Sequence, residues 1–177
     1  MTIYETADKR AHLPLLFLAD ESERMIARYL DRGTMFVLDD GGIRAEVVVC
    51  DAGSGTIEIK NIAVLPEFQR RGYGRALIDF VCSHYKSTHS AVLVGTGDSP
   101  LTVPFYESCG FARSHIVPGF FTRNYNHPIY ECGVLLDDMV YLKKSLREEN
   151  DERCPHSQRS PHSFMQSSTA RSISVRT

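Results

Sequence analysis

Residues Glu58–Tyr85, with the sequence EIKNIAVLPEFQRRGYGRALIDFVCSHY, contain a strand, a glycine turn and a helix in direct succession. The run from Ile57 to Leu65 is apolar and rich in β-branched residues, and Pro66 ends it because proline cannot extend a sheet ladder. From Arg75 onward the apolar residues recur with helical spacing, which predicts a helix that packs back on the sheet.

The glycine turn of this unit has the features of a phosphate site. Gly72 and Gly74 permit a backbone curl without side chains on its inner surface, so several N–H groups and the helix N-terminus point at one spot. A glycine pair alone is more often only a turn, but three arginines add positive charge here. The spacing fits neither the P-loop nor the dinucleotide fingerprint. The predicted phosphate-binding residues are Gln69, Arg70, Arg71, Gly72, Tyr73, Gly74 and Arg75.

Two motifs resemble those of the GNAT N-acetyltransferase superfamily. Val64–Gly74 is similar to its acetyl-CoA-binding signature, V-x-P-x-x-Q/R-x-x-G-x-G/A, and Phe105–Phe111 is similar to its second landmark, F/L-Y-x-x-x-G-F. Their order and separation also match. The resemblance implies the α/β GNAT fold, in which a mixed, mostly antiparallel sheet is flanked by helices and splayed at the acetyl-CoA site. It also implies transfer of the acetyl group of acetyl-CoA to a primary amine by direct attack in a ternary complex.

The resemblance further implies how acetyl-CoA, a co-substrate that needs no metal, is held. Its pantetheine arm would run along the backbone of Ile62, Ala63 and Val64, and the splayed edge would leave one amide to face the thioester carbonyl. Asp98 stands where the superfamily often has an asparagine that hydrogen-bonds the cofactor. An ionised aspartate can only accept a hydrogen bond there.

Two residues are candidates for the proton transfers. Tyr106, in the second landmark, would return a proton to the departing thiolate, or else it is a core tyrosine. Glu58 lies eleven residues before Gln69, as the catalytic glutamate does in the histone-acetylating branch. An amine with a pKa of about 10.4 costs roughly 4–5 kcal/mol to deprotonate at neutral pH, so a base is useful. The other interpretation of Glu58 is an ion pair with Lys60.

The long aromatic insertion Pro118–Tyr130 resembles the FFxxxY segment of a bacterial-type branch of the superfamily. Phe120, Phe121 and Tyr125 are expected to close over the acceptor, or else to pack on the sheet. The acceptor itself stays open between a small-molecule amine and a protein amine, and an acidic folded part favours a cationic small molecule through electrostatic steering. The alternative function is a catalytically inactive acyl-CoA-binding sensor or regulatory module.

Flanking segments predict the remaining elements of one domain. A capping residue within Asp20–Glu23, with a carboxylate three positions later, predicts the start of one helix, and Asp98 or Ser99 predicts the start of another. Leu13–Ala19 is expected to be a short buried element rather than a signal peptide. The predicted strands are 34–38 and 43–50 as a hairpin, 90–95 parallel to the central strand, and 111–117 with 136–142 as a final pair.

Composition limits the classes of function. The 177 residues fit one GNAT domain, 1–148, and a Ser/Arg-rich tail, 149–177, expected to be disordered. A net charge of −2 gives no footprint for nucleic acid, and no apolar stretch is long enough to span a membrane. Five scattered cysteines and seven unpaired histidines suggest neither disulfides nor a metal site, which favours a reducing, cytoplasmic location. The oligomeric state is open, with a homodimer among the alternatives.

Overall fold

The computed structural model describes residues 1–147, so the predicted tail at 149–177 lies outside the described residues. The strands are β1 (Thr2–Glu5), β2 (Thr34–Asp39), β3 (Ile43–Gly53), β4 (Thr56–Val64), β5 (Ala91–Gly97), β6 (Ala112–Val117), β7 (Ile129–Glu131), β8 (Val134–Leu136) and β9 (Met139–Ser145). The helices are α1 (Leu13–Ala19), α2 (Glu23–Leu30), α3 (Tyr73–Tyr85), α4 (Thr102–Ser108) and α5 (Phe120–Asn124), with 3-10 turns η1 (Lys9–His12) and η2 (Pro66–Phe68).

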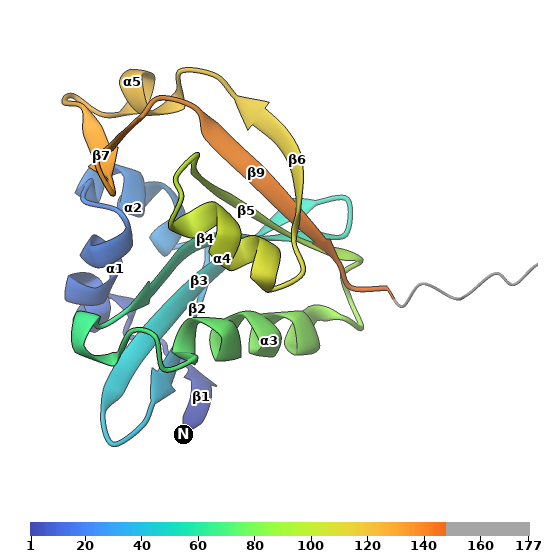
Figure 1. Ribbon diagram of the computed structural model, residues 1–177. Coiled ribbons are helices and arrows are strands. Elements are labelled where there is room, and N and C mark those ends of the chain that lie inside the picture. The colour runs from blue at the N-terminus through green and yellow to red at the C-terminus, as the bar shows by residue number, and fades with distance from the viewer. Residues whose placement is uncertain (148–177) are drawn as a thin grey trace, which may run out of the picture.

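Seven strands form one twisted sheet in the order β1-β2-β3-β4-β5-β9-β6, and β7 and β8 form a separate hairpin (Figure 1). Neighbouring strands in the large sheet are antiparallel except β4 and β5, which are parallel. The helix α3 connects these two strands, because parallel neighbours need a crossover connection, and such crossovers are ordinarily right-handed. The predicted parallel pairing of these strands is therefore confirmed, as is the mixed, mostly antiparallel fold class.

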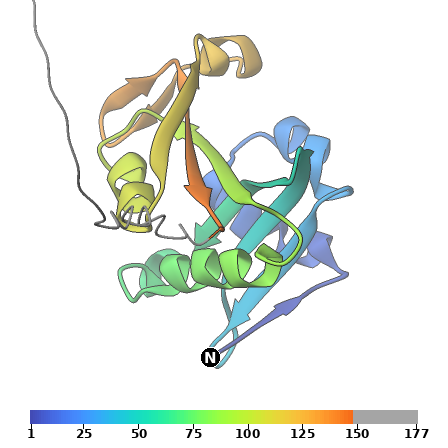
Figure 2. The same cartoon turned by 90° about the vertical axis from the view of Figure 1, so that its right-hand side faces the viewer.

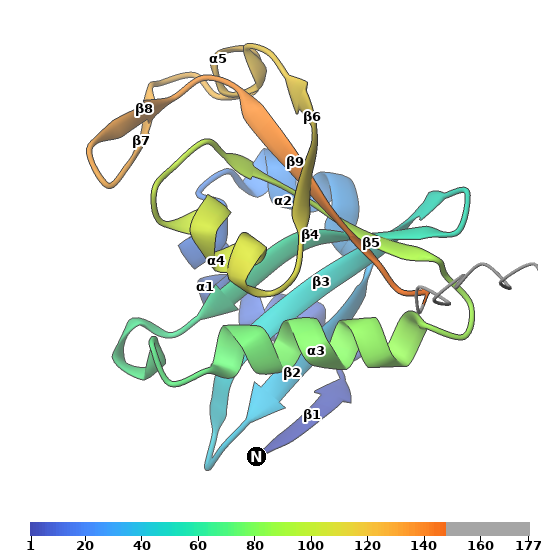
Figure 3. The same ribbon diagram turned by 45° about the vertical axis from the view of Figure 1, so that its right-hand side comes forward.

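Helices cover both faces of the sheet. In Figures 2 and 3, α3 lies across one face, whereas α1 and α2 lie on the other. Leu77, Ile78 and Val81 of α3 belong to the larger core, and residues of α1 and α2 form a second core against β2 and β3. Alternate residues of the central strands consequently meet apolar side chains on both faces, so β3 is buried through most of its length.

Several predicted boundaries were accurate and others were wrong. α2 begins where Ser22 caps it, with Ser22 Oγ accepting a hydrogen bond from Met25 N. α3 begins at Tyr73, two residues before the predicted start. The sequence analysis missed β1, which pairs with β2 at the sheet edge. The final pair of strands forms, but its second strand, β9, begins at Met139 rather than at the predicted residue 136. β9 also inserts between β5 and β6.

The insertion at 118–130 was expected to be a loop, and much of it is ordered as α5 and β7. Gly119 starts α5 with φ 60°, and its N–H donates to Asp138 Oδ1 over 2.8 Å. β7 and β8 are joined by Cys132 and Gly133, whose φ values of 49° and 77° fit a two-residue hairpin turn. Within residues 1–147, no helix is long and apolar enough to cross a membrane.

Candidate active site

A cleft of about 460 Å³ opens where β4 and β5 diverge. The two strands are paired only from Thr56–Ile59 to Ala91–Val94, after which β5 turns away along β9. The cleft is lined on one side by β4 and on the other by β5, and it also meets the segment Phe17–Glu21 after α1. The splay that the resemblance implied is therefore present.

One wall of the cleft is a strand edge without a partner. Ile62, Ala63 and Val64 pair with β3 on one side, whereas their other side faces the cleft. Gln69 lies at the end of this edge, and its Nε2 donates to the carbonyl oxygen of Val64 over 3.2 Å. An extended ligand with amide groups could lie along this edge as another strand would.

The glycine turn adopts the curled backbone that a phosphate site needs. Arg70 and Gly72 both have positive φ, 62° and 89°, and Gly72 caps α3 without any side-chain hydrogen bond to the first helical turn. The N–H groups of that turn therefore remain available. Gly74 allows a close approach, since a Cβ there would meet Phe105 Cζ of α4 at 3.1 Å.

Some side chains of the turn have partners elsewhere. Tyr73 donates from its hydroxyl to Asp40 Oδ2 over 2.5 Å, which points it toward the β2–β3 turn. Arg75 donates to the carbonyl oxygen of Ser108 over 2.9 Å and so links α3 to α4. The side chains of these two predicted phosphate-binding residues are engaged in tertiary contacts, so only their backbone N–H groups are available for a ligand at the turn.

Tyr106 lies across the cleft from β4, on α4. Its ring packs against Phe105 and Phe111, and the side chain is only 6% exposed, so the packing role and the cleft-facing role coexist. The hydroxyl makes no hydrogen bond to another described residue. Burial, followed by the charges of Cys109, Glu131 and Glu46, raises the pKa of Tyr106 above its ordinary value. The phenol is therefore neutral and able to donate.

Glu58 is engaged by a neighbour on its own strand, β4. Its Oε1 accepts from Lys60 Nζ over 2.8 Å, and it does not line the cleft, although Lys60 does. Burial, with the charge and hydrogen bond of Glu58, raises the pKa of Tyr141 to about 12. The carboxylate is thus held between a lysine and a tyrosine.

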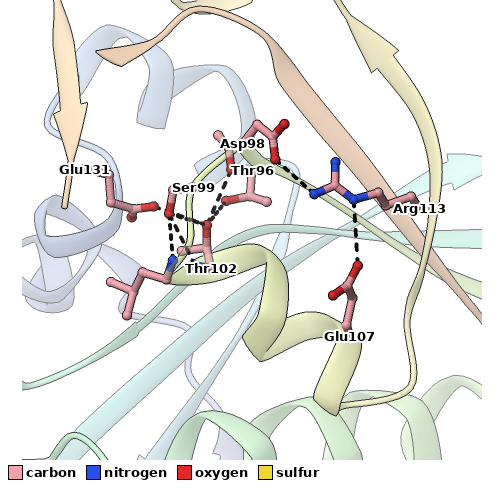
Figure 4. Close-up of polar contacts among 9 residues, drawn as sticks. Thr96, Asp98, Ser99, Thr102, Glu107, Arg113 and Glu131 are labelled. Atoms are coloured by element: carbon pink, nitrogen blue, oxygen red, sulfur yellow. Dashed lines mark hydrogen bonds and ion pairs between the residues drawn. The ribbon is translucent and has the colours of Figure 1, made fainter. Parts of the chain in front are cut away.

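Asp98 also lies outside the cleft lining. Figure 4 shows it turned toward Arg113, whose Nη2 lies 3.0 Å from Asp98 Oδ1, while Arg113 Nε lies 3.7 Å from Glu107. Asp98 does not cap α4 either. Ser99 does so, because its Oγ accepts from the backbone N–H of Leu101 and Thr102.

A polar chain that the sequence analysis did not identify enters the cleft beside α4 (Figure 4). Thr96 Oγ1 donates to Thr102 Oγ1 over 2.9 Å, and Thr102 Oγ1 donates to Glu131 Oε2 over 3.2 Å. All three residues line the cleft. They come from β5, α4 and β7, so no local pattern brings them together.

The aromatic insertion covers one end of the cleft. Phe121 and Tyr125 line it with stacked rings, whose centroids are 5.6 Å apart, whereas Phe120 packs edge-on against Phe121 without lining the cleft. Asn124 accepts hydrogen bonds from two arginines of α2, Arg24 and Arg28. Phe121 and Tyr125 therefore lie on the wall of the cleft, whereas Phe120 does not, and closure over an acceptor stays a prediction.

Carboxylates predominate among the charged groups of the cleft. Asp20 and Glu21 line one wall, Glu131 lines another, and the lysine present, Lys60, is already paired with Glu58. Burial raises the pKa of Asp20, while hydrogen bonds from the Ser22 amide and the Tyr125 hydroxyl oppose that rise. Among residues 1–147, no three His, Cys, Asp or Glu side chains are grouped so that they could hold a metal ion.

Comparison with known proteins gives consistent matches. The acetyltransferase (GNAT) domain family matches residues 31–113. The uncharacterized N-acetyltransferase YvbK of Bacillus subtilis is 36% identical over 72% of this chain and 84% of its own. The IAA acetyltransferase of Bacillus cereus is 34% identical, with a TM-score of 0.77 over 81% of this chain and 98% of that one. A GNAT family acetyltransferase from Elizabethkingia anophelis, solved with acetyl-CoA bound, is also 34% identical, with a TM-score of 0.77 over 81% and 97%.

Proposed function

Since the chain belongs to the GNAT acetyltransferase family, we propose that it transfers the acetyl group of acetyl-CoA to a primary amine that carries positive charge. The observation that supports this proposal is the cleft between β4 and β5. One end has a free strand edge and reaches Gln69, which leads into the turn that opens α3, and the other end has carboxylates and aromatic rings.

The cofactor end fits acetyl-CoA. The unpaired edge of Ile62–Val64 would hold the pantetheine amides, and the N–H groups that open α3 would hold the diphosphate. One interaction of an anion with a helix N-terminus stabilises by only about 0.3–1 kcal/mol, so several amides must act together with the positive charge of Arg70 and Arg71. A free amide of the same edge would stabilise negative charge on the thioester oxygen.

Tyr106 is the proposed proton donor. In direct attack, the amine nitrogen bonds to the carbonyl carbon, the carbon–sulfur bond breaks, and the thiolate takes a proton. The Tyr106 phenol is neutral, lines the cleft and has no competing hydrogen bond to a described residue. Glu58 stays the sequence-based candidate for the base that receives the proton of the amine, acting from its position beside Lys60.

The acceptor end favours a cation. Asp20, Glu21 and Glu131 line it. Glu21 is paired with His127, whereas Asp20 and Glu131 form no ion pair with a described residue, so a positively charged ligand gains most from these two. The faces of Phe121 and Tyr125 add an aromatic surface, on which an ammonium is stabilised by about 0.5–2 kcal/mol. A diamine, a polyamine or an amino sugar has this chemistry.

The test is release of free thiol from acetyl-CoA by the purified full chain over a matched panel of amines. The panel pairs a diamine with a monoamine and with an amino acid of equal length, and calorimetry measures binding of CoA alongside. We expect turnover with the diamine and a kcat/KM that falls as salt rises. CoA binding without any turnover would support the inactive sensor instead, and equal rates for all three amines would contradict a cationic acceptor.

A further inference from the structure

Glu131, the last residue of β7, lines the cleft, and two hydroxyl groups hold its carboxylate there (Figure 4). Thr96 Oγ1 donates to Thr102 Oγ1 over 2.9 Å, and Thr102 Oγ1 donates in turn to Glu131 Oε2 over 3.2 Å. Consecutive hydrogen bonds of this kind polarise one another, so the chain orients the carboxylate. Only Oε2 is engaged in this way. Oε1 has no hydrogen-bond partner among residues 1–147 and is available to a ligand.

The same hydrogen bond places Glu131 beside Tyr106, the proposed proton donor. Thr102 and Tyr106 are four residues apart on α4, so they lie on one face of the helix with Cβ atoms about 5–6 Å apart. A long side chain on a helix leans toward the preceding turn, which brings the Tyr106 ring toward Thr102 and the carboxylate bonded to it. Burial is the main cause that raises the pKa of Tyr106, and the charges of Cys109 and Glu131 add to it, in agreement with this placement.

The other two carboxylates of the cleft wall are engaged with the aromatic insertion. Asp20 Oδ1 accepts a hydrogen bond from the Tyr125 hydroxyl over 3.1 Å, and Glu21 is paired with His127. Neither carboxylate makes a hydrogen bond to α4. Of the three, Glu131 is therefore the one that is tied to the helix carrying the proposed proton donor.

Two glutamates of the sheet do not line the cleft. Glu58, the base suggested by the sequence, is paired with Lys60 over 2.8 Å and lies outside the lining. Glu46, in the middle of β3, is fully buried, and this burial raises its pKa to about 8. A base must lie within hydrogen-bond reach of the proton that it takes, directly or through one water. Glu131 is better placed for this than either glutamate of the sheet.

We propose that Glu131 is the group that takes protons from the acceptor nitrogen. It first takes one from the ammonium, directly or through one water, and releases it to solvent, so that the nitrogen electron pair attacks the thioester carbon. The carbon–sulfur bond then breaks, the sulfur takes the phenol proton of Tyr106, and a second proton of the nitrogen returns to the phenolate by way of Glu131. One proton is released overall, as formation of an amide and a thiol from an ammonium and a thioester requires. This inference rests on the proposed acetyl transfer.

The experiment compares Glu131→Gln with wild type in the full chain, using two diamines of equal length at saturation and pH 8. One is an ordinary diamine, whose amines are charged at this pH, and the other carries fluorine next to one amine, which leaves that amine largely neutral. Glutamine can still accept a hydrogen bond from Thr102 but cannot take a proton. We expect Glu131→Gln to lower kcat at least 100-fold with the ordinary diamine. The loss should be at least tenfold smaller with the fluorinated one, which needs no deprotonation before attack.

The matched control is Glu107→Gln on the same helix as Thr102. Figure 4 shows Glu107 turned toward Arg113, and it does not line the cleft, so kcat should stay within twofold of wild type with both diamines. A second pair of variants tests how Glu131 is held. Thr102→Val removes the donating hydroxyl and should lower kcat at least tenfold, whereas Thr102→Ser keeps it and should lower kcat less than threefold.

Calorimetric titration of CoA, which needs no turnover, should give an affinity for Glu131→Gln within twofold of wild type. An unchanged kcat in Glu131→Gln, or the same loss with both diamines, would overturn the inference and leave acetyl transfer intact. If Glu131→Gln does not fold, the Thr102 pair decides, because equal kcat in Thr102→Val and Thr102→Ser would also overturn the inference. Absence of wild-type turnover with every amine would overturn the proposed function as well.

Discussion

The hydroxyl of Tyr125 donates a hydrogen bond to Asp20 Oδ1 over 3.1 Å, although 105 residues separate the two in the sequence. This contact joins the aromatic insertion to the segment that connects α1 and α2. A second contact, between His127 Nε2 and Glu21 Oε1, joins the same two segments. This end of the cleft, where we propose that the acceptor binds, is therefore built from parts of the chain that must dock on each other.

Removing that hydroxyl should weaken binding of the acceptor. A hydrogen bond to a charged group contributes about 1.5–3 kcal/mol, so Tyr125→Phe should raise KM for the amine roughly 10- to 100-fold and leave binding of CoA unchanged. Steady-state kinetics at fixed saturating acetyl-CoA measures this. Tyr4→Phe, at an exposed tyrosine on β1, is the control. The same rise in KM for both variants would show that the contact has no role at the acceptor site.

Tyr106→Phe should lower kcat without lowering the affinity for CoA. Loss of a positioned proton donor typically costs about 10²–10⁴-fold, whereas the ring packing against Phe105 and Phe111 is retained. Kinetics and calorimetric titration of CoA check the two parts. Tyr85→Phe on α3 serves as the control. If kcat of Tyr106→Phe equals that of wild type, Tyr106 is a packing residue only.

Gly72→Ala and Gly53→Ala form a matched pair. Both glycines have positive φ, 89° and 81°, and a Cβ would meet nothing within 4 Å at either. Each substitution should cost about 1–2 kcal/mol from left-handed backbone strain and lower Tm by a few degrees. Only Gly72→Ala distorts the predicted phosphate turn, so only this variant should bind CoA more weakly. Equal affinity for CoA in the two variants would remove the turn from the binding site.

Glu46 should make the folded state less stable as pH rises. Its pKa is raised from 4.5 to about 8, so its contribution is fully present below pH 4.5 and is lost between about pH 4.5 and 8. At about 1.36 kcal/mol per pKa unit, the loss amounts to several kcal/mol. Urea unfolding at pH 5 and pH 8 should show this slope in wild type and a much flatter one in Glu46→Gln. Parallel slopes would contradict the assigned burial.

Asp98→Asn tests whether this position contacts the cofactor. Because Asp98 is paired with Arg113 and does not line the cleft, affinity for CoA should change less than twofold. The exposed ion pair should contribute at most about 1 kcal/mol to stability. Tighter binding of CoA by the asparagine variant would instead support the cofactor contact that the family resemblance implied for this position.

Local sequence predicted the strand, turn and helix beside the cleft well. Pro66 marks the end of a strand, and Gly72 sits where a positive φ is needed, so the strand, turn and helix follow from neighbouring residues. The hairpin turn at Cys132–Gly133 was missed because its first residue is not one of the asparagines or aspartates that usually signal such a turn.

Tertiary structure determined the remainder of the site. Asp20, Glu131 and Tyr125 line the same cleft only because α5 and β7 dock near α1 and α2. No spacing pattern in the sequence indicates that packing. Glu46 sits in a strand whose apolar pattern was correctly recognised, but a single charged residue in such a strand is usually assigned to the solvent face. Coverage of that face by α1, which buries it here, depends on packing between distant segments.

The β7–β8 turn also contains a site for covalent labelling. Cys132 is the only exposed cysteine within residues 1–147, whereas Cys50 and Cys109 are buried and Cys82 is partly covered. Tyr130, two residues away on the same hairpin, lines the cleft. With Cys154 replaced by serine, an environment-sensitive dye attached to Cys132 would report the arrival and departure of an acceptor by fluorescence, without any modification of the residues that bind it.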